Sequence, residues 1–262
     1  MQEDFYLKVA AALSIDPDDT VLVVCGGGHD RNVVQSIGVK RAVISNVTLH
    51  NNQSEYAPFD WQYQDAEKLS LDDRSFDWVF VHAGLHHCAS PHWALCEMLR
   101  VARKGILVIE ARDSLLNSIA GMLGLVPDFE IEPVLLSKGQ LGGVRNSNIP
   151  NYVYRWTERE FRKTISSFEP AYEHDISFAY GWRLPLQRIA MSKKALVRFA
   201  VYAAKALVPF LKAVAPRQGN RFACICRKTE AVKPWIKLDS DKVLPNLAWM
   251  ETVYDPAKYR RG

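Results

Sequence analysis

The sequence predicts an α/β fold built on a mostly parallel, doubly wound sheet of the Rossmann-like type. Short apolar runs typical of buried strands alternate with amphipathic stretches typical of helices. A glycine-rich turn, Cys25-Gly-Gly-Gly-His-Asp30, directly follows the first apolar run. Because crossovers between parallel strands have a fixed hand, this alternation places helices on both faces of the sheet.

The expected strands are apolar runs bounded by turn signals. In chain order they are residues 21–24, 41–45, 61–63, 76–81, 106–110, 171–178 and 221–226. The first follows the turn Asp16-Pro-Asp-Asp-Thr20, and the fifth follows Lys104-Gly105. Between residues 60 and 71, only Trp61-Gln-Tyr63 has strand character, so the rest is expected to be a connection.

The expected helices carry apolar residues at spacings of three and four. They cover residues 5–13, 32–37, 91–102 and 192–214, and another begins at the capping sequence Thr157-Glu-Arg-Glu160. Gly38 is expected to end the second, because glycine readily takes the left-handed conformation that closes helices. Pro209 is expected to kink the last.

The composition excludes several classes of protein. With 48% hydrophobic and 24% charged residues, the chain has none of the bias of disordered, collagen-like or disulfide-dense proteins. No apolar run approaches the roughly 18 residues of a membrane span, and the N-terminus lacks a signal-peptide pattern. The five cysteines form no CxxC pair. We therefore expect a cytoplasmic protein with reduced thiols.

Charge is unevenly distributed along the chain. Residues 183–262 hold 17 Lys and Arg against 5 Asp and Glu, a net charge of +12, which leaves −8 for residues 1–182. This favours an anionic partner: a phosphate, a membrane surface or a nucleic acid. Direct nucleic-acid binding is not expected, because no recognition module is present. In the segment Ser192 to Val214, cationic residues recur every seven residues, at Arg198, Lys205 and Lys212. A helix with such a cationic stripe can contact a membrane peripherally or cap an apolar pocket. It can also pack on its own domain or in a homodimer.

The glycine-rich turn indicates a ligand site, because backbone without Cβ atoms can approach a ligand closely. The dinucleotide fingerprint G-x-G-x-x-G is not satisfied, since Arg31 stands at the sixth position counted from Gly26. This disfavours an NAD(P)-dependent oxidoreductase.

Four further landmarks follow the turn in order. They are Asn46, the sequence Asp65-Ala-Glu-Lys-Leu-Ser-Leu71, the sequence Phe76-Asp-Trp-Val79 and the sequence Leu85-His-His87. A fifth sequence, Glu97-Met-Leu-Arg-Val-Ala-Arg-Lys-Gly105, lies after them. Together they resemble the class I S-adenosylmethionine-dependent methyltransferases, and within them the broad subgroup of the ubiquinone and menaquinone C-methyltransferases. The resemblance covers about residues 20–110. Three positions depart from it: Val23 replaces an acidic residue, His29 replaces the last loop glycine, and Asn46 replaces the carboxylate that holds the ribose.

The resemblance implies S-adenosyl-L-methionine as cofactor and assigns residues to it. Cys25, Gly26, Gly27 and Gly28 would line the methionine part, with Asp30 meeting its ammonium group. Asn46 would hold the ribose, and Asp65 and Ala66 the adenine edge. Glu67 and His82 complete the expected cofactor-binding set.

These assignments suggest how one domain over residues 1–262 is organised. Residues 15–112 form the cofactor-binding half, residues 113–156 and 183–220 form lid or acceptor-binding segments, and residues 229–262 form a C-terminal tail.

Methyl transfer to a hydroxyl needs the acceptor near the sulfonium methyl group and a base for its proton. His82 is the first candidate for this base, because it ends a strand at the ligand-binding edge. His87 matches the family's L-x-H histidine and is the second candidate. No metal is expected, because the order of His82, His86, His87, Cys88, His92 and Cys96 matches no metal-binding motif.

The most favoured activity is O-methylation of a sugar or glycolipid hydroxyl. Five aromatic residues could stack on a sugar face: Tyr152, Tyr154, Trp156, Tyr180 and Trp182. A quinone or lipid-like phenol is an alternative acceptor. A non-catalytic binding protein with a degenerate fold is a further alternative, prompted by Val23, His29 and Asn46.

Overall fold

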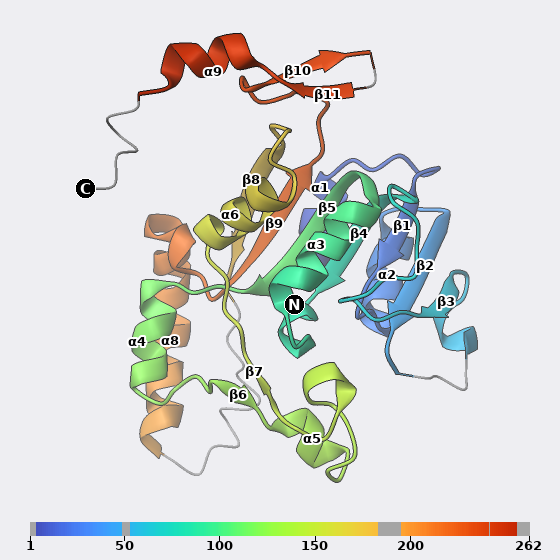
Figure 1. The fold of residues 1–262 in the computed structure, drawn as a ribbon. Coiled ribbons are helices and arrows are strands. Elements are labelled where there is room, and N and C mark those ends of the chain that lie inside the picture. The colour runs from blue at the N-terminus through green and yellow to red at the C-terminus, as the bar shows by residue number, and fades with distance from the viewer. Residues whose placement is uncertain (1–3, 49–52, 183–194, 241, 256–262) are drawn as a thin grey trace.

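The computed structural model (Figure 1) describes residues 4–48, 53–182, 195–240 and 242–255. At its centre is a seven-stranded sheet in the order β3-β2-β1-β4-β5-β9-β8. The pairs among β1 to β5 are parallel, whereas β9 runs antiparallel to both of its neighbours. The prediction of a mostly parallel α/β sheet is therefore confirmed.

The strands of the central sheet begin and end close to the predicted positions. They are β1 Thr20–Val23, β2 Arg41–Asn46, β3 Asp60–Tyr63, β4 Phe76–His82, β5 Ala102–Ala111, β8 Asp175–Gly181 and β9 Arg221–Arg227. Two small antiparallel ribbons were not predicted. They pair β6 Phe129–Glu130 with β7 Asn151–Tyr152, and β10 Ile236–Asp239 with β11 Lys242–Pro245.

The longer helices include all those predicted. They are α1 Phe5–Ala12, α2 Gly28–Ser36, α3 Pro91–Val101, α4 Leu115–Met122, α5 Glu132–Leu136, α6 Glu158–Phe168, α8 Ala195–Val214 and α9 Leu247–Val253. The capping sequence before α6 works as predicted, because Thr157 Oγ1 accepts from the Glu160 backbone N–H at 3.2 Å. Gly38 follows α2 with a φ of 82°.

The sheet is buried on both faces, as a doubly wound fold requires. One core cluster joins the sheet to α3 and α6 through residues such as Leu95 and Phe161. The other joins it to α1 and α2 through residues such as Tyr6 and Val34. Each face therefore has its own apolar layer, and the ends of the strands remain accessible at the edges of the sheet.

The segment between β5 and α6, residues 113–156, is called the insertion here. Its two ends lie together, because the Trp156 N–H donates to the Ala111 carbonyl at 2.9 Å and the Asp113 N–H donates to the Trp156 carbonyl at 2.8 Å. Figure 1 shows β6, β7 and α5 at one end of the molecule, and the ribbon β10–β11 with α9 at the opposite end. Residues 113–156, the predicted lid, thus form a folded unit whose two ends meet beside the central sheet.

Helix α8 continues through Pro209 and exposes apolar side chains, including Phe199, Tyr202 and Phe210. Residues 183–194 of the predicted second acceptor-binding segment lie outside the described residues, as do the side chains of Arg198 and Lys205. In the part of the chain that the structure describes, no helix is both long enough and apolar enough to cross a membrane.

Asp77 joins the beginnings of three strands. Its carboxylate accepts hydrogen bonds from Thr20 N and Oγ1, both at 2.9 Å, and from Arg103 Nη2 at 2.7 Å. Burial alone would raise its pKa, but these hydrogen bonds and the Arg103 charge hold the pKa at about 2. The Phe76-Asp77 landmark is therefore a structural contact rather than a ligand site.

Because its folded-state pKa lies below the usual 3.8, ionised Asp77 stabilises the fold above about pH 4 and loses this effect as the pH falls toward 2. We expect Asp77→Asn to lower the free energy of unfolding by about 2 kcal/mol at neutral pH. Urea unfolding at pH 7 and pH 3 checks this. The gap between variant and wild type should shrink at pH 3, and an equal gap at both pH values would contradict the assignment.

Candidate cofactor site

A cavity of about 290 Å³ lies at the carboxyl ends of β1, β2 and β4, where open α/β sheets bind ligands. Its walls come from five segments: the loop after β1, the end of β2, the turn at residues 65–67, the loop after β4, and the insertion. The lining residues include Cys25, Asn46, Asp65, Ala66, Glu67, Gly84, His87 and Arg145. The structure therefore brings together half of the predicted cofactor residues, together with a part of the insertion.

The glycine-rich loop divides into a packed part and an open part. A Cβ atom on Gly26 would lie 2.8 Å from Val23 Cγ1 and 2.9 Å from Ile44 Cγ2, so only glycine fits there. On Gly28, a Cβ atom would meet nothing within 4 Å, and on Gly27 only the Asp30 carboxylate at 4.0 Å. Space for a ligand is therefore left over Gly27 and Gly28.

Asn46 ends β2 and links it to the glycine-rich loop. Its Nδ2 donates to the Gly26 carbonyl at 3.1 Å, and its Oδ1 accepts from the Thr48 N–H at 3.3 Å. An amide makes both contacts, whereas a carboxylate would have no N–H to donate. Asn46 therefore fixes the loop and still borders the cavity.

The chain is similar to known methyltransferases in sequence and in fold. A family model described as a methyltransferase domain matches residues 23–109. A candidate methyltransferase from Bacillus halodurans C-125 superposes with a TM-score of 0.53, at 14% identity over 86% of this chain and 98% of that one. The chain therefore contains a stretch that matches a methyltransferase domain, and it has the class I methyltransferase fold.

Two further solved structures share the methyltransferase fold. A candidate methyltransferase, in complex with the Haloferax volcanii Trm112 methyltransferase activator, has a TM-score of 0.55 and 14% identity over 86% of this chain and 90% of its own. The YcgJ protein of Bacillus subtilis has a TM-score of 0.52 and 14% identity over 86% of this chain and 99% of its own. No curated protein matches the chain. Sequence identities this low show a shared fold and give no information about the methyl acceptor.

Asp65 lies in the turn beside the cavity of this methyltransferase. Its Oδ1 accepts from the Glu67 N–H at 2.9 Å, which holds the turn. Among the described residues, no hydrogen bond reaches its Oδ2, and both Asp65 and Ala66 line the cavity. Asp65 can therefore accept a hydrogen bond from a bound ligand.

The Glu67 carboxylate makes contacts within the protein that the sequence did not predict. Its carboxylate accepts from the backbone N–H groups of Ala89 and Ser90 at 3.0 and 2.9 Å, and pairs with Arg145 of the insertion at 2.8 and 3.0 Å. Hydrogen bonds from Arg145 lower its pKa despite burial. The Glu67 side chain thus ties the insertion and the start of α3 to the cavity wall. Glu67 also lines the cavity, so its contact with the cofactor stays a prediction.

Asp30 is buried under α1 instead of lining the cavity. Its Oδ2 accepts from the Gly27 N–H at 2.9 Å and caps α2, while Oδ1 is buried with no hydrogen-bond partner among the described residues. Burial raises its pKa to about 6. The Tyr6 hydroxyl is likewise buried, with no hydrogen-bond partner in the part of the chain that the structure describes. The expected contact of Asp30 with the methionine ammonium is therefore not supported by its position.

His82 ends β4 on the face covered by α1. Its ring stacks on Tyr6 at 4.9 Å between centroids and lies 5.4 Å from the His29 ring. Burial, with the Arg221 charge, lowers its pKa to about 4, and its Nε2 is buried with no hydrogen-bond partner among the described residues. His82 does not line the 290 Å³ cavity, although Ala83 directly after it does.

His86 and His87 lie in the short helix Leu85–His87 that follows β4. His86 Nδ1 lies 2.8 Å from Glu110 Oε2 at the end of β5, and its Nε2 lies 3.4 Å from Glu130 Oε2 in β6. Burial alone would lower the His86 pKa, but the two carboxylates raise it to about 10. Glu110 is 1% exposed and also accepts from the Leu85 N–H at 2.7 Å, so it positions the whole loop after β4.

His87 borders the cavity directly. Its Nε2 lies 3.4 Å from Glu130 Oε2. Burial, together with the neighbouring His86, lowers its pKa. The sequence identified His87 but missed Glu110, Glu130 and Arg145.

Most of the predicted aromatic lid is structural. Trp156 is fully buried and stacks on Phe161 at 4.4 Å. The hydroxyls of Tyr154 and Tyr180 donate to Glu160 and Glu158 at 2.6 and 2.8 Å. The expectation that a sugar stacks on Trp156 is therefore wrong, because this ring is fully buried, whereas stacking on Tyr154 or Tyr180 stays a prediction. Tyr152 is half exposed against Phe129, and Trp182 lines a second cavity.

Proposed function

We propose that this methyltransferase O-methylates a hydroxyl of a small-molecule acceptor, with sugars and glycolipids as the first class to test. The observation that carries the proposal is that His82, which lines neither cavity, has close neighbours in the lining of both. Ala83, the next residue, lines the 290 Å³ cavity. Phe5, the neighbour of the Tyr6 ring on which His82 stacks, lines a second cavity of about 450 Å³.

The first cavity fits S-adenosylmethionine by the chemistry of its walls. Gly27 and Gly28 do not line this cavity, but they follow Cys25, which does, and the open space over them leaves room for the methionine part. Asn46 lies at the end of β2, where the ribose is expected, and Asp65 presents a carboxylate oxygen for the adenine edge. The departures at Val23 and His29 leave this cavity open, since neither residue lines it.

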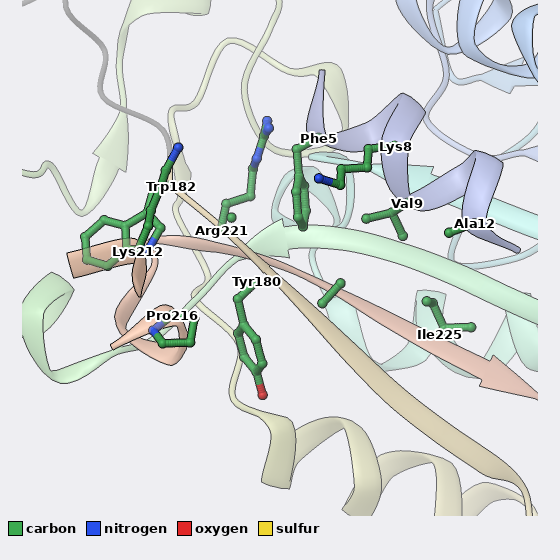
Figure 2. A pocket seen from close by; sticks show the side chains of 12 residues that line it. Phe5, Lys8, Val9, Ala12, Tyr180, Trp182, Lys212, Pro216, Arg221 and Ile225 are labelled. Atoms are coloured by element: carbon green, nitrogen blue, oxygen red, sulfur yellow. The ribbon is translucent and has the colours of Figure 1, made fainter. Parts of the chain in front are cut away.

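The second cavity supports an acceptor with an apolar body and an anionic group. Its apolar walls come from α1, β8 and β9, and include Phe5, Val9 and Ile225 (Figure 2). Three cationic residues, Lys8, Lys212 and Arg221, also line it. The Trp182 indole N–H is buried with no hydrogen-bond partner among the described residues, so it can donate to a hydroxyl.

Figure 2 also shows why Tyr180 is not part of this proposal. Its ring points away from Phe5 and Lys8, toward the opposite face of the sheet, where its hydroxyl is bonded to Glu158. Of the five aromatic residues considered for sugar stacking, Tyr180 and Trp182 belong to the lining of this second cavity.

His82 is the proposed base. S-adenosylmethionine supplies an electrophilic methyl carbon bonded to sulfur. His82 would take the hydroxyl proton as the acceptor oxygen receives the methyl group and S-adenosylhomocysteine leaves. Burial keeps the imidazole neutral near pH 7, so one of its ring nitrogens carries the lone pair that this step needs.

Cofactor binding is tested by thermal unfolding with S-adenosylhomocysteine, with NADP as control. At about 100 times its Kd, a ligand adds about 2.7 kcal/mol, which raises the Tm by several degrees at this size. We expect a shift with S-adenosylhomocysteine alone. Asp65→Ala should weaken its affinity about tenfold, the loss of one hydrogen bond to a carboxylate, without unfolding the apo protein.

The matched control is Asp72→Ala, an exposed aspartate in the same connection that does not line the cavity. It should bind S-adenosylhomocysteine as the wild type does. Unchanged affinity in Asp65→Ala would remove the adenine assignment, and no shift in the wild type would overturn the proposed reaction.

We expect His82→Ala to lower turnover about 100-fold or more while leaving cofactor affinity near normal. A radiolabelled methyl-transfer assay against sugar phosphates, glycolipids and quinols measures this, and also separates the two acceptor classes. His29→Ala, which removes the neighbouring exposed ring, is the control. Full turnover in His82→Ala would end its assignment as base.

A further inference from the structure

Three side chains from distant parts of the chain meet beside the cofactor cavity. His86 Nε2, His87 Nε2 and one oxygen of Glu130 all lie within 4.8 Å of one another. The two histidines follow β4 and the glutamate lies in β6 of the insertion. The side chains of the three residues are 9%, 32% and 24% exposed, so the cluster is close to the surface but largely shielded from water.

We propose that His86, His87 and Glu130 form a binding site for one divalent transition-metal ion of the zinc type. Zinc binds histidine nitrogen and carboxylate oxygen at about 2.0–2.2 Å in tetrahedral geometry, which places neighbouring ligand atoms about 3.4 Å apart. Both histidine nitrogens lie 3.4 Å from Glu130 Oε2. A charge-assisted hydrogen bond would instead bring these atoms to about 2.7–2.9 Å.

The surroundings of His86 strengthen this assignment. Its Nδ1 lies 2.8 Å from the buried carboxylate of Glu110. A metal-binding histidine typically donates its second ring N–H to such a carboxylate, which fixes the ring and directs the other nitrogen at the metal. Glu110 is itself fixed by the Leu85 N–H at 2.7 Å, so the partner of His86 is rigidly placed.

Three protein ligands leave a fourth position for water or for an oxygen of a bound molecule. Because His87 also lines the cofactor cavity, the ion would lie at the edge of that cavity. It would also join the insertion to the loop after β4. The proposed metal site is argued from its three ligand residues alone and is independent of the proposed acceptor.

The test uses the full chain without a polyhistidine tag, stripped with a chelator and then titrated with Zn²⁺ by calorimetry. Co²⁺ serves as a spectroscopic probe, because its visible absorption reports tetrahedral coordination. We expect one ion per chain in the wild type, with a rise in Tm. His87→Ala and Glu130→Gln should each weaken binding at least about 100-fold, and Glu110→Gln should weaken it about 10- to 100-fold by releasing the His86 ring.

The matched controls are His29→Ala and Glu230→Gln, which alter exposed residues away from the cluster. They should bind Zn²⁺ as the wild type does. Circular dichroism of each apo variant shows that lost binding is not lost folding. The proposal is overturned if the wild type takes up no ion at micromolar Zn²⁺, or if His87→Ala and Glu130→Gln bind it as tightly as the controls.

Discussion

Replacing Glu110 with alanine is expected to lower the free energy of unfolding by about 3–5 kcal/mol, the range seen when one partner of a buried ion pair is removed. The carboxylate is fully buried, pairs with His86 at 2.8 Å and accepts from the Leu85 N–H at 2.7 Å. Its loss leaves a buried imidazole and a buried N–H without their acceptor. Urea unfolding of metal-free protein at pH 7 measures the effect.

Glu110→Gln separates the two contacts, because its amide oxygen can still accept from Leu85 while the charge is lost. We expect the free energy of unfolding of Glu110→Gln to lie between those of the wild type and Glu110→Ala. Glu173→Ala, at an exposed glutamate, should change the free energy of unfolding by less than about 0.5 kcal/mol. A loss under 1 kcal/mol in Glu110→Ala would show that this ion pair does not hold the loop after β4.

Gly84→Ala is expected to reduce the affinity for S-adenosylhomocysteine on the order of 100-fold, the penalty typical of a displacement of about 1 Å at a site. The added Cβ atom would lie 2.5 Å from Cys25 Cβ and 2.9 Å from Val81 Cγ2, far inside carbon–carbon contact distance. Gly84 has a φ of −121°, which alanine adopts readily, so the effect is steric alone. Either Cys25 and its glycine-rich loop or the loop after β4 must move. Both border the cofactor cavity.

Gly121→Ala provides the control for this prediction. Gly121 lies in α4, and a Cβ atom there would meet nothing within 4 Å. Alanine should raise stability slightly, because it favours the helix, and leave ligand affinity unchanged. Calorimetric titration of both variants gives the comparison, and normal affinity in Gly84→Ala would show that the cavity tolerates movement of these loops.

Much of the fold could be predicted because the central strands are buried on both faces. β4 and β5 appear in the sequence as apolar runs with turn residues before them. β8 begins at Asp175 instead of 171, since Tyr172 bridges to Val232 and the Glu173 N–H donates to the Ala231 carbonyl. The ribbon β10–β11 was missed, because its side chains are largely exposed and give no apolar signal.

The candidate site was only partly predictable for a related reason. Cys25, Asn46 and Asp65 follow strands that are neighbours or close along the sheet, so a parallel fold brings them together. Arg145 meets Glu67 from 78 residues away, and it comes from an insertion without clear periodicity. Successive side chains of β4 point to opposite faces of the sheet, so the face of His82 depends on the exact residue at which the strand begins. The sequence does not fix that residue, and it therefore could not show whether His82 faces the cofactor cavity or α1.

The anchoring of the insertion has an evolutionary consequence. Hydrogen bonds among Ala111, Asp113 and Trp156 hold its two ends together. Residues 113–156 are therefore connected to the central sheet in the way a closed loop is. Loops of this kind change in length at little cost, because closure entropy grows only slowly with the number of residues. Relatives could therefore exchange this segment for one of another size or shape without disturbing the strands. Selection could then change the part of the cofactor cavity wall that the insertion supplies while the strands stay constant.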